Sequence, residues 1–350
     1  MENESLKKNT LLGLGNPLLD ISAIVEQEFL IKYELKPNDA ILADAEKHKN
    51  LYAELVEKYK TEYIAGGSVQ NALRVCQWLI GKPSVTTFFG CVGEDNYSKV
   101  LNQRAVSEGV NARYQYTGAE PTGTCAVLVT GHHRSLCANL GAANCFTIDH
   151  ILLPDNKKLV NTARFYYISG FFLTVSPPSI MEVANVALAN DRPLAMNLSA
   201  PFISQFYKEP LMQVLPYVDV LFGNETEAET FAQEQDFGTK DIKEIAIKLC
   251  NMPKQNEKRS RVVVLTQGVH PVILAHNGKI KEFPVKVLPA DQLVDTNGAG
   301  DAFAGGFLSQ YIQGRDLTVS IKCGMWAARQ IVQRSGCTFD GKANFDPAEE

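Results

Sequence analysis

The hydrophobic residues of this chain follow two spacings, and each spacing predicts one kind of element. Short apolar runs are typical of buried strands, and apolar residues that recur every three or four positions are typical of helices that pack on one face. The pattern predicts strands over 11–15, 84–89, 165–169, 194–197, 218–222 and 262–266, and helices over 68–80, 96–106, 178–188, 225–234, 241–250, 302–313 and 318–334. Because strands and helices alternate, we expect an α/β fold with a doubly wound, mainly parallel sheet flanked by helices.

Two regions depart from this alternation. Residues 112–143 contain short strand-like runs joined by turns at 118–121 and 131–133, which predict antiparallel ribbons outside the main sheet. A helix capped by Asn38 or Asp39 is predicted to continue to about residue 59. We therefore expect one domain over 1–350 that carries a small, discontinuous α/β lid of approximately 21–64 and 112–143. His132 and His133 occupy one of the turns, where histidines are more often loop residues than metal ligands.

Composition and charge narrow the classes of function. The 350 residues are 45% hydrophobic, which is ample for a buried core, and the net charge is -5 without a long Lys/Arg block. These values argue against a nucleic-acid or membrane-surface binder. No apolar run reaches the roughly 18 residues of a membrane span, and the polar start does not resemble a signal peptide. The eight cysteines include no CxxC pair, as in free thiols of a reducing compartment, so we expect a cytoplasmic protein without zinc.

The strongest chemical signal is the segment Asp295-Thr296-Asn297-Gly298-Ala299-Gly300-Asp301. Its two glycines let the backbone bend and present consecutive N–H groups. The helical spacing that follows places this turn at the positive end of a helix, which favours anions. A carboxylate beside an anion repels it, so Asp301 indicates a general base rather than a simple binding site. The alternative is a loop followed by an acidic helix start.

Polar residues also follow several predicted strands, where ligands bind in open α/β sheets. Asn16 and Asp20 follow the first strand, and Gly66-Gly67-Ser68 leads into a helix with Asn71 in its first turn. Each could equally be a solvated turn. Further along the chain, the polar residues at or just after the ends of predicted strands are Asn197, Asn224 with Glu227, and Gln267-Gly268. Asn224 and Glu227 also match a helix capping box.

These separate features occur in order in one known family. The chain resembles the ribokinase-type carbohydrate kinases, on Gly66-Gly67 followed by Asn71-Ala72 and on the 295–301 segment followed by Gly305-Gly306. Gly223-Asn224-Glu225-Thr226-Glu227 is similar to the NxxE element of that family. Segments 134–136, 171–176 and 197–202 resemble its adenosine kinases rather than its sugar kinases. The resemblance extends from about residue 12 to residue 339.

The resemblance implies a transferase that phosphorylates the 5′-hydroxyl of adenosine with ATP and Mg²⁺, giving AMP and ADP in purine salvage. It assigns Asp301 as the base, the amides of Gly298, Ala299 and Gly300 as the anion hole, and Arg134 as a group that reaches the phosphate when the lid closes. It further implies a monomer whose partners are adenosine and ATP, not nucleic acid or membrane. The location that the resemblance implies is the cytoplasm, and it is compatible with presence in the nucleus as well.

The resemblance also implies three groups of ligand contacts. The ribose would be held by Asn16, Asp20, Gly66, Gly67 and Asn71, and Ser68 and Asn297 would be further substrate-binding residues. The adenine would be walled by Leu18, Ile41, Leu42, Cys125, Leu136, Ala138, Leu140, Phe172 and Phe202. ATP would lie near Asn197, Asn224, Glu227, Thr266, Gln267 and Gly268, with Mg²⁺ held by Asn224 and Glu227 through water.

Three other functions share parts of this pattern. A ribose or fructose kinase would keep both glycine signatures but not the apolar set that includes Phe172 and Phe202. A nucleoside-binding protein without activity would have no need for Asp301, Arg134 and Glu227 together. A nicotinamide-dependent oxidoreductase would show GxGxxG after the first strand, where this chain has Gly13-Leu14-Gly15-Asn16-Pro17, without the third glycine.

Overall fold

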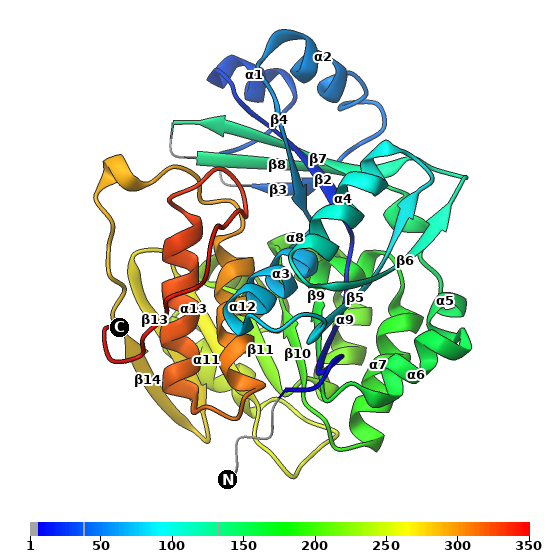
Figure 1. Ribbon diagram of the computed structural model, residues 1–350. Coiled ribbons are helices and arrows are strands. Elements are labelled where there is room, and N and C mark those ends of the chain that lie inside the picture. Colours follow the sequence, from blue (N-terminus) through cyan, green and yellow to red (C-terminus); the bar gives the residue numbers. More distant parts are fainter. Residues whose placement is uncertain (1–5, 38, 132) are drawn as a thin grey trace.

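A computed structural model describes residues 6–37, 39–131 and 133–350 of the chain. The cap predicted at Asn38 and the loop position predicted for His132 lie outside these residues. The structure has two β-sheets, a large one with helices on both faces and a small one above it (Figure 1). None of the helices in the described ranges has both the length and the apolar character of a membrane span.

The large sheet has nine strands in the order β14-β13-β12-β11-β10-β9-β1-β5-β6. Their bounds are β1 Leu11–Leu14, β5 Thr86–Gly93, β6 Asn111–Thr117, β9 Phe165–Ser169, β10 Leu194–Asn197, β11 Val220–Asn224, β12 Val262–Gln267, β13 His270–His276 and β14 Lys279–Phe283. All neighbouring strands from β12 to β6 are parallel, and β13 and β14 form an antiparallel hairpin at one edge. The doubly wound α/β fold predicted from the sequence is therefore confirmed.

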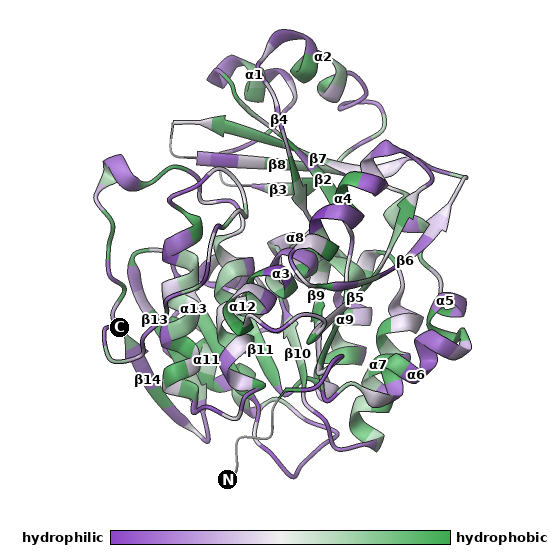
Figure 2. Ribbon diagram, in the orientation of Figure 1, coloured by the Kyte–Doolittle hydropathy of each residue, from purple (hydrophilic) through white to green (hydrophobic). Residues whose placement is uncertain are grey.

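Alternate residues of the central strands enter two separate cores. On β9, Tyr166 and Ile168 join the core beneath α7, α10 and α11, whereas Tyr167 joins the core beneath α3 and α12. Strands buried on both faces need apolar side chains at every position, which explains the continuous apolar runs of the sequence and of Figure 2. The helices are α1 Gln27–Lys32, α2 Leu51–Lys58, α3 Ser68–Ile80, α4 Asn96–Ser107, α5 Ile148–Leu152, α6 Pro154–Thr162, α7 Pro177–Ala189, α8 Pro201–Phe206, α9 Lys208–Val214, α10 Glu225–Glu234, α11 Ile242–Asn251, α12 Ala299–Tyr311 and α13 Leu317–Ile331.

The small sheet has five strands in the order β3-β8-β7-β2-β4. Their bounds are β2 Leu18–Ile24, β3 Ala40–Leu42, β4 Glu62–Gly66, β7 Thr122–Thr130 and β8 His133–Gly141. Along β7, Ala126 and Leu128 pack under α1 and α2, while Cys125 and Val127 belong to an apolar cluster on the opposite face. Because side chains alternate along a strand, one face of this sheet is closed by its own helices and the other is apolar and faces the large sheet.

Three element predictions were wrong. The run at 113–116 is part of β6, which pairs parallel with β5 at the edge of the large sheet instead of forming a ribbon outside it. The helix predicted from 38–39 to 59 is restricted to α2, because residues 40–42 form β3 and pair with Leu136 to Ala138 of β8. The strand predicted over 84–89 does not end there, because Gly90 to Gly93 continue β5 alongside β6. In each case pairing with a distant strand decided the structure, and local pattern carries no such information.

Candidate active site

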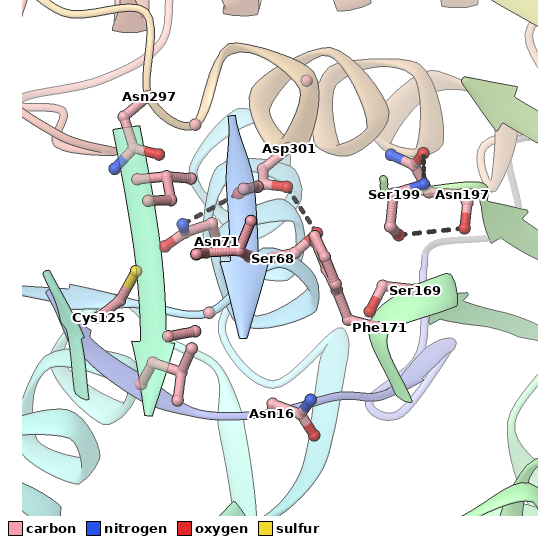
Figure 3. A pocket seen from close by; sticks show the side chains of 18 of the residues that line it. Asn16, Ser68, Asn71, Cys125, Ser169, Phe171, Asn197, Ser199, Asn297 and Asp301 are labelled. Carbon is pink, nitrogen blue, oxygen red and sulfur yellow. Dashed lines mark hydrogen bonds between the residues drawn. The ribbon is translucent and has the colours of Figure 1, made fainter. Parts of the chain in front are cut away.

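A cavity of about 420 Å³ lies between the two sheets and is lined by residues of both (Figure 3). It is large enough for a nucleoside-sized ligand. The structure brings most of the predicted site residues to its wall: Asn16, Leu18, Asp20, Ile41, Leu42, Gly67, Ser68, Asn71, Cys125, Arg134, Leu136, Ala138, Leu140, Asn197, Phe202, Asn224, Glu227, Asn297, Gly298, Gly300 and Asp301.

Asp301 lies where the N-termini of α3 and α12 meet. Its two carboxylate oxygens accept one hydrogen bond each, from Ser68 Oγ at 2.6 Å and from Asn71 Nδ2 at 3.1 Å (Figure 3). Burial raises the pKa of Asp301, and the bonds from Ser68 and Asn71 oppose that rise. Each oxygen keeps a further lone pair, so a fixed carboxylate with capacity to take a proton faces the cavity.

The turn before α12 presents backbone amides beside this carboxylate. Gly298 caps the helix with φ +77°, a left-handed conformation that favours glycine. A Cβ at Gly300 would meet no atom within 4 Å, so this part of the turn borders open space. Ala302 N is bonded to Gly298 O at 2.8 Å, whereas the first amides of a helix have no intrahelical acceptor. Ala299 does not line the cavity, and its amide donates to Thr296 O at 3.3 Å.

Asp20 lies on β2 and carries a buried carboxylate. Asn297 Nδ2 donates to its Oδ2 at 3.3 Å. Burial raises the pKa of Asp20 to about 7, and the negative charges of Asp301 and Asp295 add to that rise, while the bond from Asn297 lowers it. Asn297 occupies only one of the acceptor positions of this carboxylate, and a ligand with hydroxyl groups would supply further donors.

The glycine pair at the end of β4 allows the chain to pass close to Asp20 and Asn16. A Cβ at Gly66 would lie 2.3 Å from Asp20 Oδ1, so Gly66 borders the carboxylate without lining the cavity itself. Gly67 has φ +92°, and a Cβ there would lie 2.3 Å from Asn16 O. Asn16 Oδ1 is buried and has no hydrogen-bond partner among the described residues. A side chain at either glycine would displace the polar residues that face the ligand space.

The inner face of the small sheet supplies the predicted apolar wall. Leu18, Cys125 and Leu140 form one cluster with Leu42, Leu136 and Ala138 packed against it. Phe202 lines the cavity and packs against Phe171 with 6.0 Å between ring centroids. The wall is therefore built from alternate residues of β2, β7 and β8, which the strand spacing places on one face.

Phe172, predicted as part of this wall, is instead a core residue. It is 0% exposed and packs edge-on against Phe146, with 5.3 Å between centroids. Its neighbour Phe171 lines the cavity. Both lie in the 3₁₀ helix Gly170–Thr174, where successive side chains point about 120° apart, so adjacent residues face different surroundings. The prediction was wrong by one residue, because a 3₁₀ turn this short has no repeating pattern of apolar positions in the sequence that would show which ring faces the cavity.

Arg134 of the small sheet is held by residues next to the glycine-rich turn. Its Nε donates to Asp295 Oδ1 at 2.7 Å, and its other nitrogens donate to the carbonyls of Val294 and His133. Asp295 also accepts from the amides of Asn297 at 2.7 Å and Gly336 at 2.8 Å. This buried ion pair joins the small sheet to the turn and fixes a positive charge at the cavity wall.

Asn224 and Glu227 both line the cavity and also form the capping box of α10. Asn224 Oδ1 accepts from Glu227 N at 2.8 Å, and Glu227 Oε2 accepts from Asn224 N at 2.9 Å. Burial raises the pKa of Glu227 to about 7, and the charges of Glu225 and Asp301 contribute. Across the described residues, no group of three or more His, Cys, Asp or Glu side chains is arranged to hold a metal ion.

Three residues predicted near ATP do not reach the cavity wall. Thr266 donates to Gly223 O at 3.4 Å, Gln267 donates to Pro271 O at 2.6 Å, and Gly268 forms the turn into β13 with φ +56°. Thr266 and Gln267 are the last two residues of β12 and Gly268 follows them, and β12 lies next to β11, the strand that ends at Asn224.

The cavity also has lining residues that were not predicted. They are Asp39, Ala40, Ser169, Phe171, Thr174, Ser199 and Thr296. Ser169 is the last residue of β9 and Ser199 follows β10, at the same sheet edge as Asn197, so the rule that polar residues at the ends of parallel strands face ligands could have found them. Ser199 has φ +73°, and its Oγ accepts from Gly170 N at 2.9 Å. The positions of Asp39 and Ala40 at the cavity depend on the pairing of β3 with β8, which the sequence pattern did not predict.

A sequence model of the pfkB family carbohydrate kinases matches residues 27–343 of the chain. The chain belongs to this family. This pfkB-family chain is 49% identical over 346 residues to adenosine kinase 2 of Arabidopsis thaliana, covering 99% of this chain and 100% of the relative. It is 43% identical over 329 residues to adenosine kinase of Dictyostelium discoideum, with 94% and 96% covered. The family predicted from the sequence motifs is confirmed.

Solved structures of the family give the same result. The crystal structure of Anopheles gambiae adenosine kinase in complex with P1,P4-di(adenosine-5) tetraphosphate matches with a TM-score of 0.95 and 57% identity, covering 97% of this chain and 100% of that one. Adenosine kinase from Schistosoma mansoni in complex with adenosine in occluded loop conformation matches with a TM-score of 0.92 and 35% identity, covering 96% and 98%. The agreement extends over both sheets of this chain.

Proposed function

We propose that this chain is an adenosine kinase, which transfers the γ-phosphoryl group of ATP to the 5′-hydroxyl of adenosine and releases AMP and ADP. The observation that carries the proposal is one cavity that combines a fixed carboxylate at two helix N-termini with a second carboxylate and an apolar wall. The first carboxylate can take a proton beside an anion, the second can accept hydrogen bonds from ribose hydroxyls, and the apolar wall can pack against the flat adenine ring.

The relatives support both substrates. Proteins named adenosine kinase are 49% and 43% identical to this chain over nearly its whole length. The Anopheles structure holds a molecule in which two adenosines are joined by four phosphates. We infer that the corresponding space in this chain accommodates a nucleoside acceptor and the phosphate chain of a nucleotide donor.

In the proposed reaction, Asp301 takes the proton of the 5′-hydroxyl as the oxygen attacks the γ-phosphorus. A new P–O bond forms to the nucleoside, and the bond between the γ-phosphorus and the bridging oxygen of ADP breaks, with the electron pair leaving on ADP. Ser68 and Asn71 hold both oxygens of Asp301 in one orientation. A base fixed in this way loses little entropy when the transition state forms.

The charge of the transferring group requires stabilisation by fixed positive ends of dipoles and by cations. We assign this role to the amides around Gly298 and Gly300 at the N-terminus of α12 and to Arg134. Asp295 holds the guanidinium at the wall before any phosphate arrives. We further propose that the small sheet acts as a lid, over about 18–66 and 122–141, which excludes water from the reacting groups.

ATP is proposed to lie between Asn197 and the end of β12, with Asn224, Glu227, Thr266, Gln267 and Gly268 around it. A single buried carboxylate with an adjacent amide fits Mg²⁺, which keeps several waters and takes its remaining ligands from phosphates. Bound there through water, Mg²⁺ would neutralise negative charge on the phosphates. Asn224 and Glu227 would orient those waters, and the capping box keeps both side chains in place.

We also propose that the enzyme acts as a cytoplasmic monomer. All eight cysteines are free thiols, as is usual in a reducing compartment. The apolar outer face of the small sheet is covered by α1 and α2 of the same chain, so it needs no second subunit to cover it.

A panel of acceptors tests the function. Purified protein with Mg-ATP should release ADP with adenosine at a kcat/KM far above that with ribose or fructose, since free sugars cannot fill the apolar wall. Inosine and guanosine should be discriminated less, because a hydrophobic pocket that makes no hydrogen bond rejects analogues by only about 1 to 3 kcal/mol. Ala40 supplies no side-chain hydrogen bond at this wall. Turnover on a sugar alone would refute adenosine as acceptor, and no turnover on any acceptor would favour a binding protein.

We expect Phe171 to contribute mainly to adenosine binding and its neighbour Phe172 mainly to the stability of the fold. Phe171→Ala removes a ring from the cavity wall, so we expect the KM for adenosine to rise roughly tenfold with a modest loss of stability. Phe172→Ala empties a fully buried site and should cost about 3 to 5 kcal/mol of unfolding free energy. Thermal melts and adenosine kinetics on both variants measure this. The reverse result, a stable Phe172→Ala with a high KM, would restore the original prediction.

A further inference from the structure

Arg74 is a fully buried arginine behind the catalytic carboxylate. It lies on α3 and is 0% exposed. Its Nε donates to Glu108 Oε2 at 2.5 Å and its Nη2 to Glu108 Oε1 at 3.0 Å, a bidentate pair. Its Nη1 donates to Ala65 O at 3.0 Å and to Asn71 Oδ1 at 3.0 Å. An apolar residue would fill such a site at less cost, so the buried ion pair points to a role in specifying a conformation.

The contact with Asn71 decides which way that amide points. A guanidinium has only donors, so only the oxygen of Asn71 can face it. The amide nitrogen must then face the other way, and there it donates to Asp301 Oδ2 at 3.1 Å. Without Arg74, the side chain of Asn71 could rotate and present its oxygen to the carboxylate, which would repel it. Figure 3 shows Asn71 directed at Asp301.

We propose that Arg74 is a positioning residue: held by Glu108, it locks the amide of Asn71 so that its nitrogen, never its oxygen, serves the catalytic base. This rests on the proposed function, since it assigns a purpose to the Asp301 contact. The line of contacts runs from Glu108 on the turn after α4, through Arg74 and Asn71, to Asp301 on α12.

The orientation that Arg74 imposes on the Asn71 amide should affect the titration of Asp301. The bond from Asn71 lowers the pKa of Asp301 against the rise that burial causes. Loss of the lock therefore raises the pKa further, so the base is protonated at a higher pH. Other charged or titratable groups around Asp301 would be present in every variant: Asp20 on β2, Asp295 before α12, Tyr167 on β9, Glu227 on α10 and Cys337 near the C-terminus.

The test compares Arg74→Met with Arg74→Lys, which keeps a donor towards Asn71. The readout is the pKa of Asp301 from ¹³C NMR of protein labelled at aspartate carboxyls, with the resonance assigned by Asp301→Asn. Arg74→Met should raise this pKa by about one unit, and the acid limb of kcat/KM for adenosine should move by the same amount. Arg74→Lys should restore both to near the wild-type values.

Arg261→Met is the matched control. Arg261 is also 0% exposed, but it donates to the carbonyls of Val218, Leu215 and Leu249, far from the cavity. It should lower stability and leave the Asp301 titration unchanged. An unshifted titration in folded Arg74→Met would overturn the proposal. If that variant does not fold, Glu108→Gln should shift the titration in the same direction, and its failure to do so would overturn the proposal too. A wild-type protein that makes no AMP would refute the proposed function separately, because the NMR titration needs no turnover.

Discussion

Asp301→Asn is expected to lower kcat for adenosine phosphorylation by roughly 10² to 10⁴, as the loss of a general base does. Asparagine keeps the size of the side chain and an oxygen for Ser68, so the fold should survive, but it cannot take the 5′-hydroxyl proton. The KM for ATP should change little, because the donor phosphates bind to other groups. Steady-state kinetics with thermal melts on the same preparation measure the effect.

The pH profile gives this variant a second signature. Burial raises the pKa of Asp301 above its ordinary value, so wild-type kcat/KM should fall on acidification at a higher pH than for an exposed carboxylate. The residual kcat/KM of Asp301→Asn should not show that fall on acidification. Asp316→Asn is a matched control, since Asp316 caps the adjacent α13 and asparagine caps equally well. A variant at Asp301 with near-normal turnover would remove the base from the mechanism.

Asp20→Asn should lose activity and gain stability. A carboxylate that accepts two ribose hydroxyls makes two charge-assisted bonds, each worth about 1.5 to 3 kcal/mol. Part of this is offset because a neutral amide costs less to bury, so we expect kcat/KM for adenosine to fall by roughly 10² to 10³. Most of the change should appear in KM, because the contact proposed for Asp20 is with the part of the substrate that does not react.

The gain in stability should depend on pH in a defined direction. The folded pKa of Asp20 is raised to about 7, from about 4 in an unfolded chain. A raised folded pKa gives stability that is present below the unfolded pKa and is lost as pH rises through the folded one. Wild-type protein should thus lose roughly 2 to 4 kcal/mol between pH 4 and pH 8 through this group. Asp20→Asn escapes that loss.

The measurement is the difference in melting temperature between Asp20→Asn and wild type at pH 5 and at pH 8. It should be small at pH 5 and clearly positive at pH 8. The raised pKa of Glu227 acts on both proteins, so it cancels in the difference. Asp219→Asn is the opposite control: Asp219 pairs with Lys254 at 2.5 Å and Arg259 at 3.0 Å, so its loss should lower stability and spare the kinetics. A difference in melting temperature that does not grow with pH would contradict the raised pKa of the buried Asp20.

The positions of Asp301 and Asn71 in their helices were predictable from local signals. Each lies in the first turn of a helix that follows glycines. That the two residues meet was implied by the resemblance to the kinase family and not by a topology rule, because α3 follows β4 of the small sheet and α12 follows a loop after β14. The apolar wall was predictable in part, because Cys125, Leu136 and Ala138 alternate along strands.

The failures share a different cause. Phe171 and Phe172 are adjacent and equally apolar, and only the 3₁₀ turn decides which ring faces the ligand. The contact of Arg134 with Asp295 joins positions 161 residues apart, and the orientation of Asn71 depends on a buried arginine. Contacts of this kind arise when elements pack, and a hydrophobic pattern along one chain does not encode them.

The most direct test of the central claim is the identity of the phosphorylated product. ³¹P NMR on purified protein with Mg-ATP and adenosine should show AMP phosphorylated at the 5′ position and ADP in equal amounts, with little inorganic phosphate. Equal amounts are expected because the proposed lid would exclude water, so that every phosphoryl group goes to the nucleoside. ADP matched by inorganic phosphate, or phosphate on the 2′ or 3′ oxygen, would contradict the placement of Asp301 at the 5′-hydroxyl.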